Sequence, residues 1–210
     1  MERLYKALFI LSFLQVGCSN PEYLKPEALN KFILDTDNGL IQKVELNGYA
    51  IGVMYKPTDL WVQQEIGDID VDERRIKSLR DKYDQYYYFI LNLSKNNKEA
   101  LHQTEGGFGQ YSELVQTLSF RMNSYVNLTT TTHDTIPTSD FILNRTYGLS
   151  DATSLLFVFS KEKAKSAAWV QFNLNEFGLG IGNQRFRFKT EDLEEVPHID
   201  FNEVEKPNKK

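Results

Sequence analysis

Three basic residues, Arg185, Arg187 and Lys189, alternate with Phe186 and Phe188 near the end of this 210-residue sequence. Successive side chains of a strand point to opposite faces, so this alternation puts the cations on one face and the aromatic rings on the other. Such a cationic face could bind an anion, for example a lipid phosphate or an acidic glycan. The alternative is an ordinary half-buried strand whose charged face is only solvated.

The histidines offer one weaker arrangement with catalytic character. His133 is followed by Asp134, and an imidazole beside a carboxylate can act as an acid/base pair. The threonine-rich segment around them also fits an exposed strand and turn. His102 and His198 stand apart in the sequence, which contains no HExxH, GxSxG or P-loop motif. The sequence therefore favours a protein without enzymatic activity, leaves an enzyme open, and predicts no cofactor.

Alternating carboxylates at Asp68, Asp70 and Asp72 have a spacing with which some loops bind Ca²⁺. The pattern departs from an EF-hand, because Glu73 stands where the loop needs glycine and Leu79 where it needs the bidentate glutamate. We expect an acidic turn whose last residue, Asp72, caps a helix, and we expect no metal site.

The elements that must position these residues change character along the chain. Helical spacing of apolar residues alternates with strand patterns up to residue 122, whereas a period of two dominates afterwards. The dipeptide Asn47–Gly48 predicts a tight hairpin turn. This order predicts an α+β fold, with an antiparallel sheet of about five to seven strands and two to four helices packed on it. The predicted helices cover 27–34, 60–65, 73–82 and 111–122, and the predicted strands cover 40–46, 49–55, 86–93, 125–132, 140–147, 154–160, 168–175 and 184–189.

The first eighteen residues have the layout of an export signal. Arg3 and Lys6 precede an apolar run at 7–16, which is too short to span a bilayer because a spanning helix needs about 20 residues. Its length and basic flank fit the apolar region of a secretory signal peptide. Gly17 then precedes Cys18, the single cysteine of the chain, so no intrachain disulfide and no cysteine-based zinc site can form.

The segment Leu14-Gln15-Val16-Gly17-Cys18 resembles the lipobox of bacterial lipoproteins, in the looser form typical of Bacteroidetes. It departs from the family at Gln15, since the family usually has leucine three residues before the cysteine. The resemblance implies that the thiol of Cys18 receives a diacylglyceryl group and that cleavage leaves Cys18 as the first mature residue. Two acyl chains are enough to anchor a protein stably to a membrane.

This resemblance divides the chain and gives it a location. It implies a signal peptide at 1–17, a tether at 18–26, a single α+β domain at 27–196 and a polar tail at 197–210. The protein would lie in the cell envelope, and Ser19 favours the outer membrane, because proteobacterial lipoproteins kept in the inner membrane have aspartate there. Asp134-Thr135-Ile136 also resembles the O-glycosylation sequon of secreted Bacteroidetes proteins, which makes Thr135 a candidate glycosylation site.

Three functions stay open for such a protein. The first is a non-enzymatic accessory or assembly subunit of an envelope complex, favoured by the anchor and the missing catalytic motifs. The second is a tethered module that binds a glycan or a lipid, and the third is an envelope hydrolase with a site near His133 and Asp134. The expected partners are the membrane, through the lipid on Cys18, and an envelope protein. Nucleic acid is not expected, because 24 Lys+Arg against 29 Asp+Glu give a net charge of -5.

Overall fold

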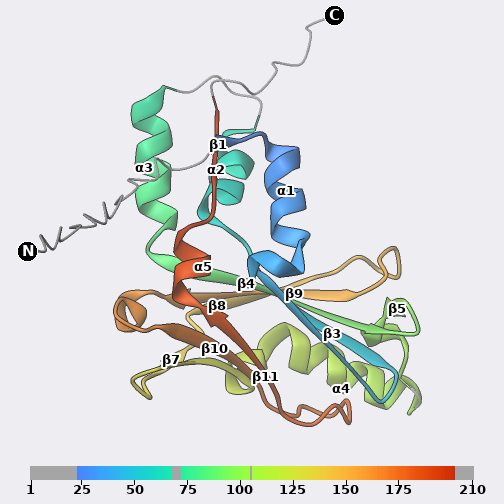
Figure 1. Cartoon of the computed structure of the whole chain (residues 1–210). Helices are drawn as coiled ribbons and strands as arrows, with labels where there is room; N and C mark the ends of the chain where they lie inside the picture. Colours follow the sequence, from blue (N-terminus) through green and yellow to red (C-terminus); the bar gives the residue numbers. More distant parts are fainter. Residues whose placement is uncertain (1–22, 68–71, 105, 202–210) are drawn as a thin grey trace, which may run out of the picture.

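The computed structural model describes residues 23–67, 72–104 and 106–201. Over these ranges the chain forms five α-helices, four short 3-10 helices and twelve strands, which confirms the predicted α+β class. The strands form antiparallel sheets of six and four strands and one short parallel pair, so they are divided between two sheets instead of lying in one. Helices α1, α2 and α3 gather at one end of the molecule (Figure 1).

The larger sheet is built around β4, which corresponds to the strand predicted at 86–93. β4 pairs with β3 on one side and with β9 on the other, and Phe89, Leu91 and Leu93 on its inner face are fully buried. The predicted hairpin turn is confirmed, because Asn47 and Gly48 have φ angles of 52° and 76°, as a type I′ turn requires. The order is β2-β3-β4-β9-β8, with β5 also paired to β4. The strands are β2 (Ile41–Leu46), β3 (Tyr49–Tyr55), β4 (Tyr86–Lys95), β5 (Lys98–Glu99), β8 (Asp140–Asn144) and β9 (Thr153–Ser160).

The smaller sheet has the order β11-β10-β6-β7, and its edges meet those of the larger sheet. On one side, β7 continues through Thr138 and Ser139 into β8, so the chain passes directly from the smaller sheet to the larger one. On the other side, the side-chain amide of Gln42 on β2 donates to the carbonyl oxygen of Arg187 on β11. The strands are β6 (Val126–Thr130), β7 (Thr135–Pro137), β10 (Trp169–Leu174) and β11 (Gln184–Lys189).

The centre of the core between the two sheets is a cluster of phenylalanines. Neighbouring rings lie 5.0 to 6.4 Å apart between centroids, and several pairs meet edge to face, the arrangement that the ring quadrupole favours. These rings come from the inward positions of four strands, so their packing joins the sheets to each other. The cluster consists of Phe89, Phe157, Phe159, Phe172 and Phe188, all buried.

The four helices expected from the sequence are present. Asp72 caps α3 as predicted, because its carboxylate accepts a hydrogen bond from the backbone N–H of Arg75 at 2.8 Å. α4 begins at Gly107, four residues before the predicted start. The glycines there are poor helix formers, but the side chain of Gln110 accepts a hydrogen bond from the N–H of Gly106 and stabilises the first turn. The helices are α1 (Pro26–Leu34), α2 (Thr58–Ile66), α3 (Glu73–Tyr83), α4 (Gly107–Phe120) and α5 (Thr190–Glu194), and the 3-10 helices are η1 (Thr36–Asn38), η2 (Ala100–His102), η3 (Met122–Ser124) and η4 (Glu162–Ala164).

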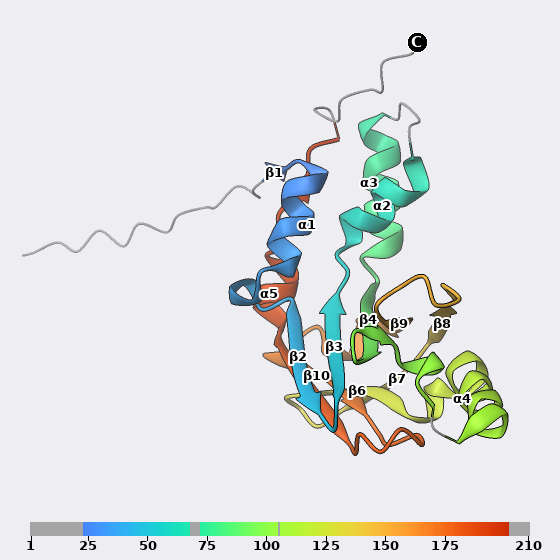
Figure 2. The ribbon, with the colours of Figure 1, turned by 90° about the vertical axis from the view of Figure 1, so that its right-hand side faces the viewer.

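The two ends of the described chain are paired with each other. β1 (Tyr23–Leu24), within the predicted tether, lies parallel to β12 (His198–Ile199), within the predicted tail. Ile199 is only 1% exposed, so the folded body extends past residue 196. Figure 2 shows this pair with α1 at the end of the molecule opposite α4. Within the described ranges, no helix is both long enough and apolar enough to cross a membrane; Cys18 lies outside them.

Candidate functional site

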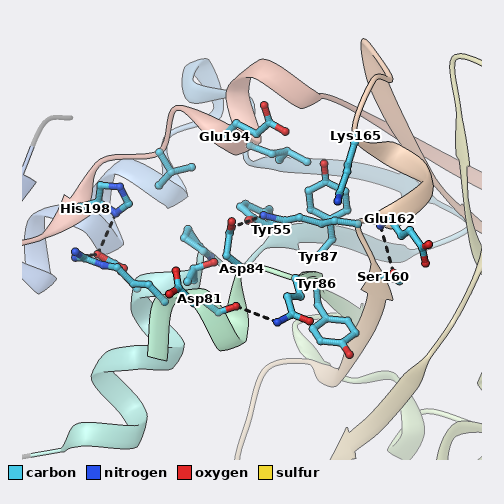
Figure 3. Close-up of a pocket in the computed structure, with 18 of the residues that line it drawn as sticks. Tyr55, Asp81, Asp84, Tyr86, Tyr87, Ser160, Glu162, Lys165, Glu194 and His198 are labelled. Carbon is cyan, nitrogen blue, oxygen red and sulfur yellow. Dashed lines mark hydrogen bonds and ion pairs between the residues drawn. The ribbon is translucent and has the colours of Figure 1, made fainter. Parts of the chain in front are cut away.

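A cleft of about 970 Å³ opens where the helical end of the molecule meets the larger sheet (Figure 3). That volume lies within the range of small-molecule sites. The lining comes from segments far apart in the sequence: the end of β3, the start of α2, the α3–β4 junction, the end of β9 with η4, and the stretch from α5 to β12. This cleft could not be predicted from the sequence, because no single segment contributes enough of its lining to form a motif.

Two buried phenols, those of Tyr55 and Tyr87, line this cleft. The two side chains are 2% and 1% exposed, and their rings meet edge to face at 6.1 Å. Neither hydroxyl has a hydrogen-bond partner within the part of the chain that the structure describes. Burial raises the pKa of both phenols, and the nearby carboxylates of Glu194 and Asp84 raise it further. Both hydroxyls therefore stay protonated near neutral pH, where each can donate and accept a hydrogen bond.

Charged side chains stand around these phenols. The ammonium of Lys161 lies 2.6 Å from the carboxylate of Asp84 and 5.1 Å from the ring centroid of Tyr87, so this pair is neutral overall. Lys165 extends into the same cleft, and Glu194 lies at its rim (Figure 3). The cleft thus brings together hydroxyl groups, an ammonium donor and carboxylate acceptors.

One wall of the cleft is fixed by a buried carboxylate, that of Asp59, which is 2% exposed. It accepts two hydrogen bonds from Arg80, at 2.7 and 2.6 Å, and one from the backbone N–H of Ile199 at 2.6 Å. Burial alone would raise the pKa of Asp59, but hydrogen bonds from His198, Arg80 and Ile199 together lower it below its ordinary value. Asp59 therefore holds α2, α3 and β12 together.

The contact between His198 and Asp59 invites comparison with a hydrolase dyad. Nδ1 of His198 lies 3.3 Å from the Asp59 carboxylate. Within the described ranges, however, no serine or threonine hydroxyl hydrogen-bonds to His198. Because Asp59 is already bound by Arg80 and Ile199, we assign this contact to the wall of the cleft and not to catalysis.

The structure places the predicted anion-binding residues on the smaller sheet, not in the cleft. Arg185, Arg187 and Lys189 are exposed on the outer face of β11, and Phe186 and Phe188 between them are buried, so the predicted separation of the two faces is confirmed. Thr135, the candidate glycosylation site, is exposed on β7 and opposes Thr129 on that same sheet.

The structure also places the candidate acid/base residues, His133 and Asp134. His133 has a φ of 63° in the turn between β6 and β7, and Asp134 accepts a hydrogen bond from the hydroxyl of Thr132 at 2.7 Å. Asp68 and Asp70 lie outside the described residues. Across the described ranges no group of three or more His, Cys, Asp or Glu side chains is placed to hold a metal ion.

The glycine-rich loop 178–182 is filled by a side chain of the protein itself. The carboxylate of Glu176 accepts hydrogen bonds from the backbone N–H groups of Gly178, Leu179, Gly180 and Gly182. These bonds lower the pKa of Glu176, although burial acts in the opposite direction. The carboxylate of Glu176 therefore occupies the backbone N–H groups of this loop.

Comparisons with known proteins add a single observation. No protein-family model and no curated protein sequence matches the chain. Among solved structures, a novel protein of unknown function from Burkholderia pseudomallei K96243 is similar at 13% identity and a TM-score of 0.37, over 83% of this chain and 94% of its own. A similarity of that degree carries no argument about this chain.

Proposed function

We propose that this protein is a lipoprotein of the bacterial cell envelope, held to the outer membrane through Cys18, whose folded domain binds a sugar in the cleft. The anchor is supported by the apolar run at 7–16 and by the lone cysteine directly after Gly17. Sugar binding is supported by one observation above all: two buried phenols, Tyr55 and Tyr87, line the cleft with no hydrogen-bond partner among the described residues.

The mixture of groups in the cleft favours a sugar over a strongly charged ligand. Each sugar hydroxyl both donates and accepts hydrogen bonds, as the phenols do, while Lys165 can donate and Glu194 can accept. Arg80 pairs with Asp59 and Lys161 pairs with Asp84. Asp81 and Glu162 add two further carboxylates to the lining, which disfavours an anionic ligand. A ligand with many hydroxyl groups and little net charge matches this arrangement.

Titration calorimetry with maltose, cellobiose and chitobiose tests sugar binding. Tyr87→Phe removes one hydroxyl and keeps the buried ring. The loss of one hydrogen bond, worth about 0.5–1.5 kcal/mol, should weaken binding roughly 2- to 13-fold. Tyr125→Phe is the matched control, because this ring packs on Phe177 and does not line the cleft. The proposal fails if none of the three sugars binds, or if both variants bind as tightly as the wild type.

The anchor is tested separately by Cys18→Ala. The wild type should be found in the membrane fraction with the mass of a diacylated protein, whereas the variant should remain an unlipidated precursor. A variant that keeps both the lipid mass and the membrane fraction contradicts lipidation at Cys18.

A second candidate function, an accessory subunit of an envelope complex, is favoured by an apolar row on the outer face of the larger sheet. Met54, Ile90, Leu156 and Ile142 oppose one another in register across β3, β4, β9 and β8. Ile142 is 58% exposed and the other three are partly exposed. With about 4.8 Å between strands the row is about 14 Å long, which suits contact with an envelope protein.

Cross-linking and pull-down from detergent-solubilised membranes test this second candidate. An envelope protein recovered with the wild type should be lost with Ile142→Asp, while sugar binding by that variant is unchanged. Equal recovery with both proteins would show that the apolar row is not the contact.

A further inference from the structure

The outer face of the smaller sheet is an ordered polar surface. Cross-strand pairing places its residues in three rows, because opposed residues of a sheet share a face. The rows are Lys189–Trp169, Arg187–Gln171–Thr129–Thr135 and Arg185–Asn173–Asn127–Pro137. Apart from Pro137, every one of these side chains can form hydrogen bonds with a ligand.

Hydrogen bonds connect this surface across three strands. Arg187 donates to the side chain of Gln171 at 3.1 Å, and Gln171 donates to the side chain of Asn173 at 2.8 Å. Asn173 in turn donates to the side chains of Asn127 at 2.9 Å and Thr129 at 3.1 Å. The amide groups are therefore held in fixed orientations before any ligand arrives, which reduces the entropy lost on binding.

The cations on this surface form no ion pair with the acidic groups among the described residues. The guanidinium carbon of Arg187 lies 4.2 Å from the ring centroid of Trp169, so the ring supports Arg187 without neutralising it. Within the described ranges, neither Arg185 nor Lys189 forms an ion pair. None of the three rows contains a carboxylate, although the whole chain has a net charge of -5. This segregation of positive charge complements an anion.

The shape of the surface selects an extended anion. Arg185 and Lys189 are four residues apart on one strand, or about 13 Å, and the longer rows cross four strands over about 14 Å. A small anion would contact one cation, whereas a chain molecule with repeated charges can contact all three. An anionic bilayer would use the charges alone, but the amide and hydroxyl groups between them match the hydroxyls of a carbohydrate.

We propose that the outer face of the smaller sheet binds an anionic polysaccharide, with Arg185, Arg187 and Lys189 contacting its charges and with Gln171 and Asn173 contacting its hydroxyl groups. None of these residues lines the cleft. This surface therefore stands independently of the sugar site proposed there.

Binding of dextran sulfate and of uncharged dextran of the same length tests the proposal with the full chain. Dextran sulfate should bind, with an affinity that falls as salt is added, and dextran should bind at least tenfold more weakly. Arg185→Glu with Lys189→Glu should reduce the affinity for dextran sulfate at least tenfold. The matched control is Arg74→Glu with Lys77→Glu, which makes the same charge change on exposed positions of α3 and should leave the affinity within about twofold.

If both double variants lose affinity for dextran sulfate equally, binding depends only on the total charge of the protein, and the proposal is overturned. The absence of dextran sulfate binding to the wild type would also overturn it. Should the glutamate variant melt at a lower temperature than the control, Arg185→Gln with Lys189→Gln replaces it with the same expectation.

Gln171→Ala separates a polysaccharide surface from a membrane surface. This variant keeps every charge and should still weaken dextran sulfate binding about threefold or more. If it has no effect, and vesicles containing anionic phospholipid bind the wild type more tightly than dextran sulfate does, the face binds a bilayer and the proposal is wrong.

Discussion

Replacing Asp59 with alanine should destabilise the folded domain by about 3–5 kcal/mol, the cost of removing one partner of a buried ion pair. The carboxylate is 2% exposed and accepts two hydrogen bonds from Arg80 and one from the N–H of Ile199. Loss of this carboxylate leaves the partly buried guanidinium of Arg80 without its counter-charge and releases β12 from α2. Asp59 is thus a stability determinant of the wall of the cleft.

The same contact should depend on pH in a defined direction. The pKa of Asp59 is lowered in the folded protein and is ordinary in the unfolded chain. A lowered carboxyl pKa stabilises the fold above the unfolded-state pKa, and this contribution is lost as the pH falls through the folded-state pKa. The gap in unfolding free energy between the wild type and Asp59→Asn should therefore shrink between pH 7 and pH 3.

Urea unfolding followed by the fluorescence of Trp61 and Trp169 measures both effects. Arg74→Ala is the control, because that side chain is 94% exposed and its removal should change the free energy of unfolding by no more than about 0.5 kcal/mol. The reasoning is refuted if Asp59→Ala lies within 1 kcal/mol of the wild type at pH 7, on the scale of an exposed ion pair. A difference in unfolding free energy between the wild type and Asp59→Asn that does not change with pH would refute only the predicted pH dependence.

Three further changes test other parts of the structure. Phe172→Ala should cost about 3–5 kcal/mol of unfolding free energy, because the ring packs between the sheets; a cost below 1 kcal/mol by urea unfolding would contradict that packing. Glu176→Gln should speed hydrogen exchange of the amides of Gly178, Leu179, Gly180 and Gly182, which lose their anionic acceptor; unchanged protection would show that the carboxylate does not order the loop. Gly48→Ala should lower stability by about 1 kcal/mol in thermal unfolding, since its φ of 76° disfavours a side chain; an unchanged melting temperature would argue against the type I′ turn.

The sequence predicted the features that depend on short-range pattern. The Asn47–Gly48 turn, the capping of α3 by Asp72 and the two faces of β11 each follow from neighbouring residues, and each is confirmed. The division of the strands between two sheets was not predicted, because it depends on which strand pairs with which. β7, only three residues long, was missed for a related reason: its pattern is too short to detect.

The cleft was missed because tertiary packing creates it. Tyr87 lies in the strand predicted at 86–93, and nothing local indicated that its hydroxyl borders a cleft. Glu194 comes from a helical turn more than a hundred residues later. Asp59 directly precedes the helix predicted at 60–65, but nothing local indicated that Arg80 and Ile199 would converge on it.

The meeting of the sheet edges has a consequence for the protein when many copies are crowded together. A free edge strand offers unpaired backbone groups to which a strand of another molecule can add, the first step of aggregation. Here the side-chain amide of Gln42 donates a hydrogen bond to the carbonyl oxygen of Arg187, and that of Asn47 donates one to the carbonyl oxygen of Gly180 at 2.9 Å. At the other edge, β7 runs directly into β8. Neighbouring copies therefore find less backbone to pair with at these corners, which suits the proposed anchoring of many copies to one membrane.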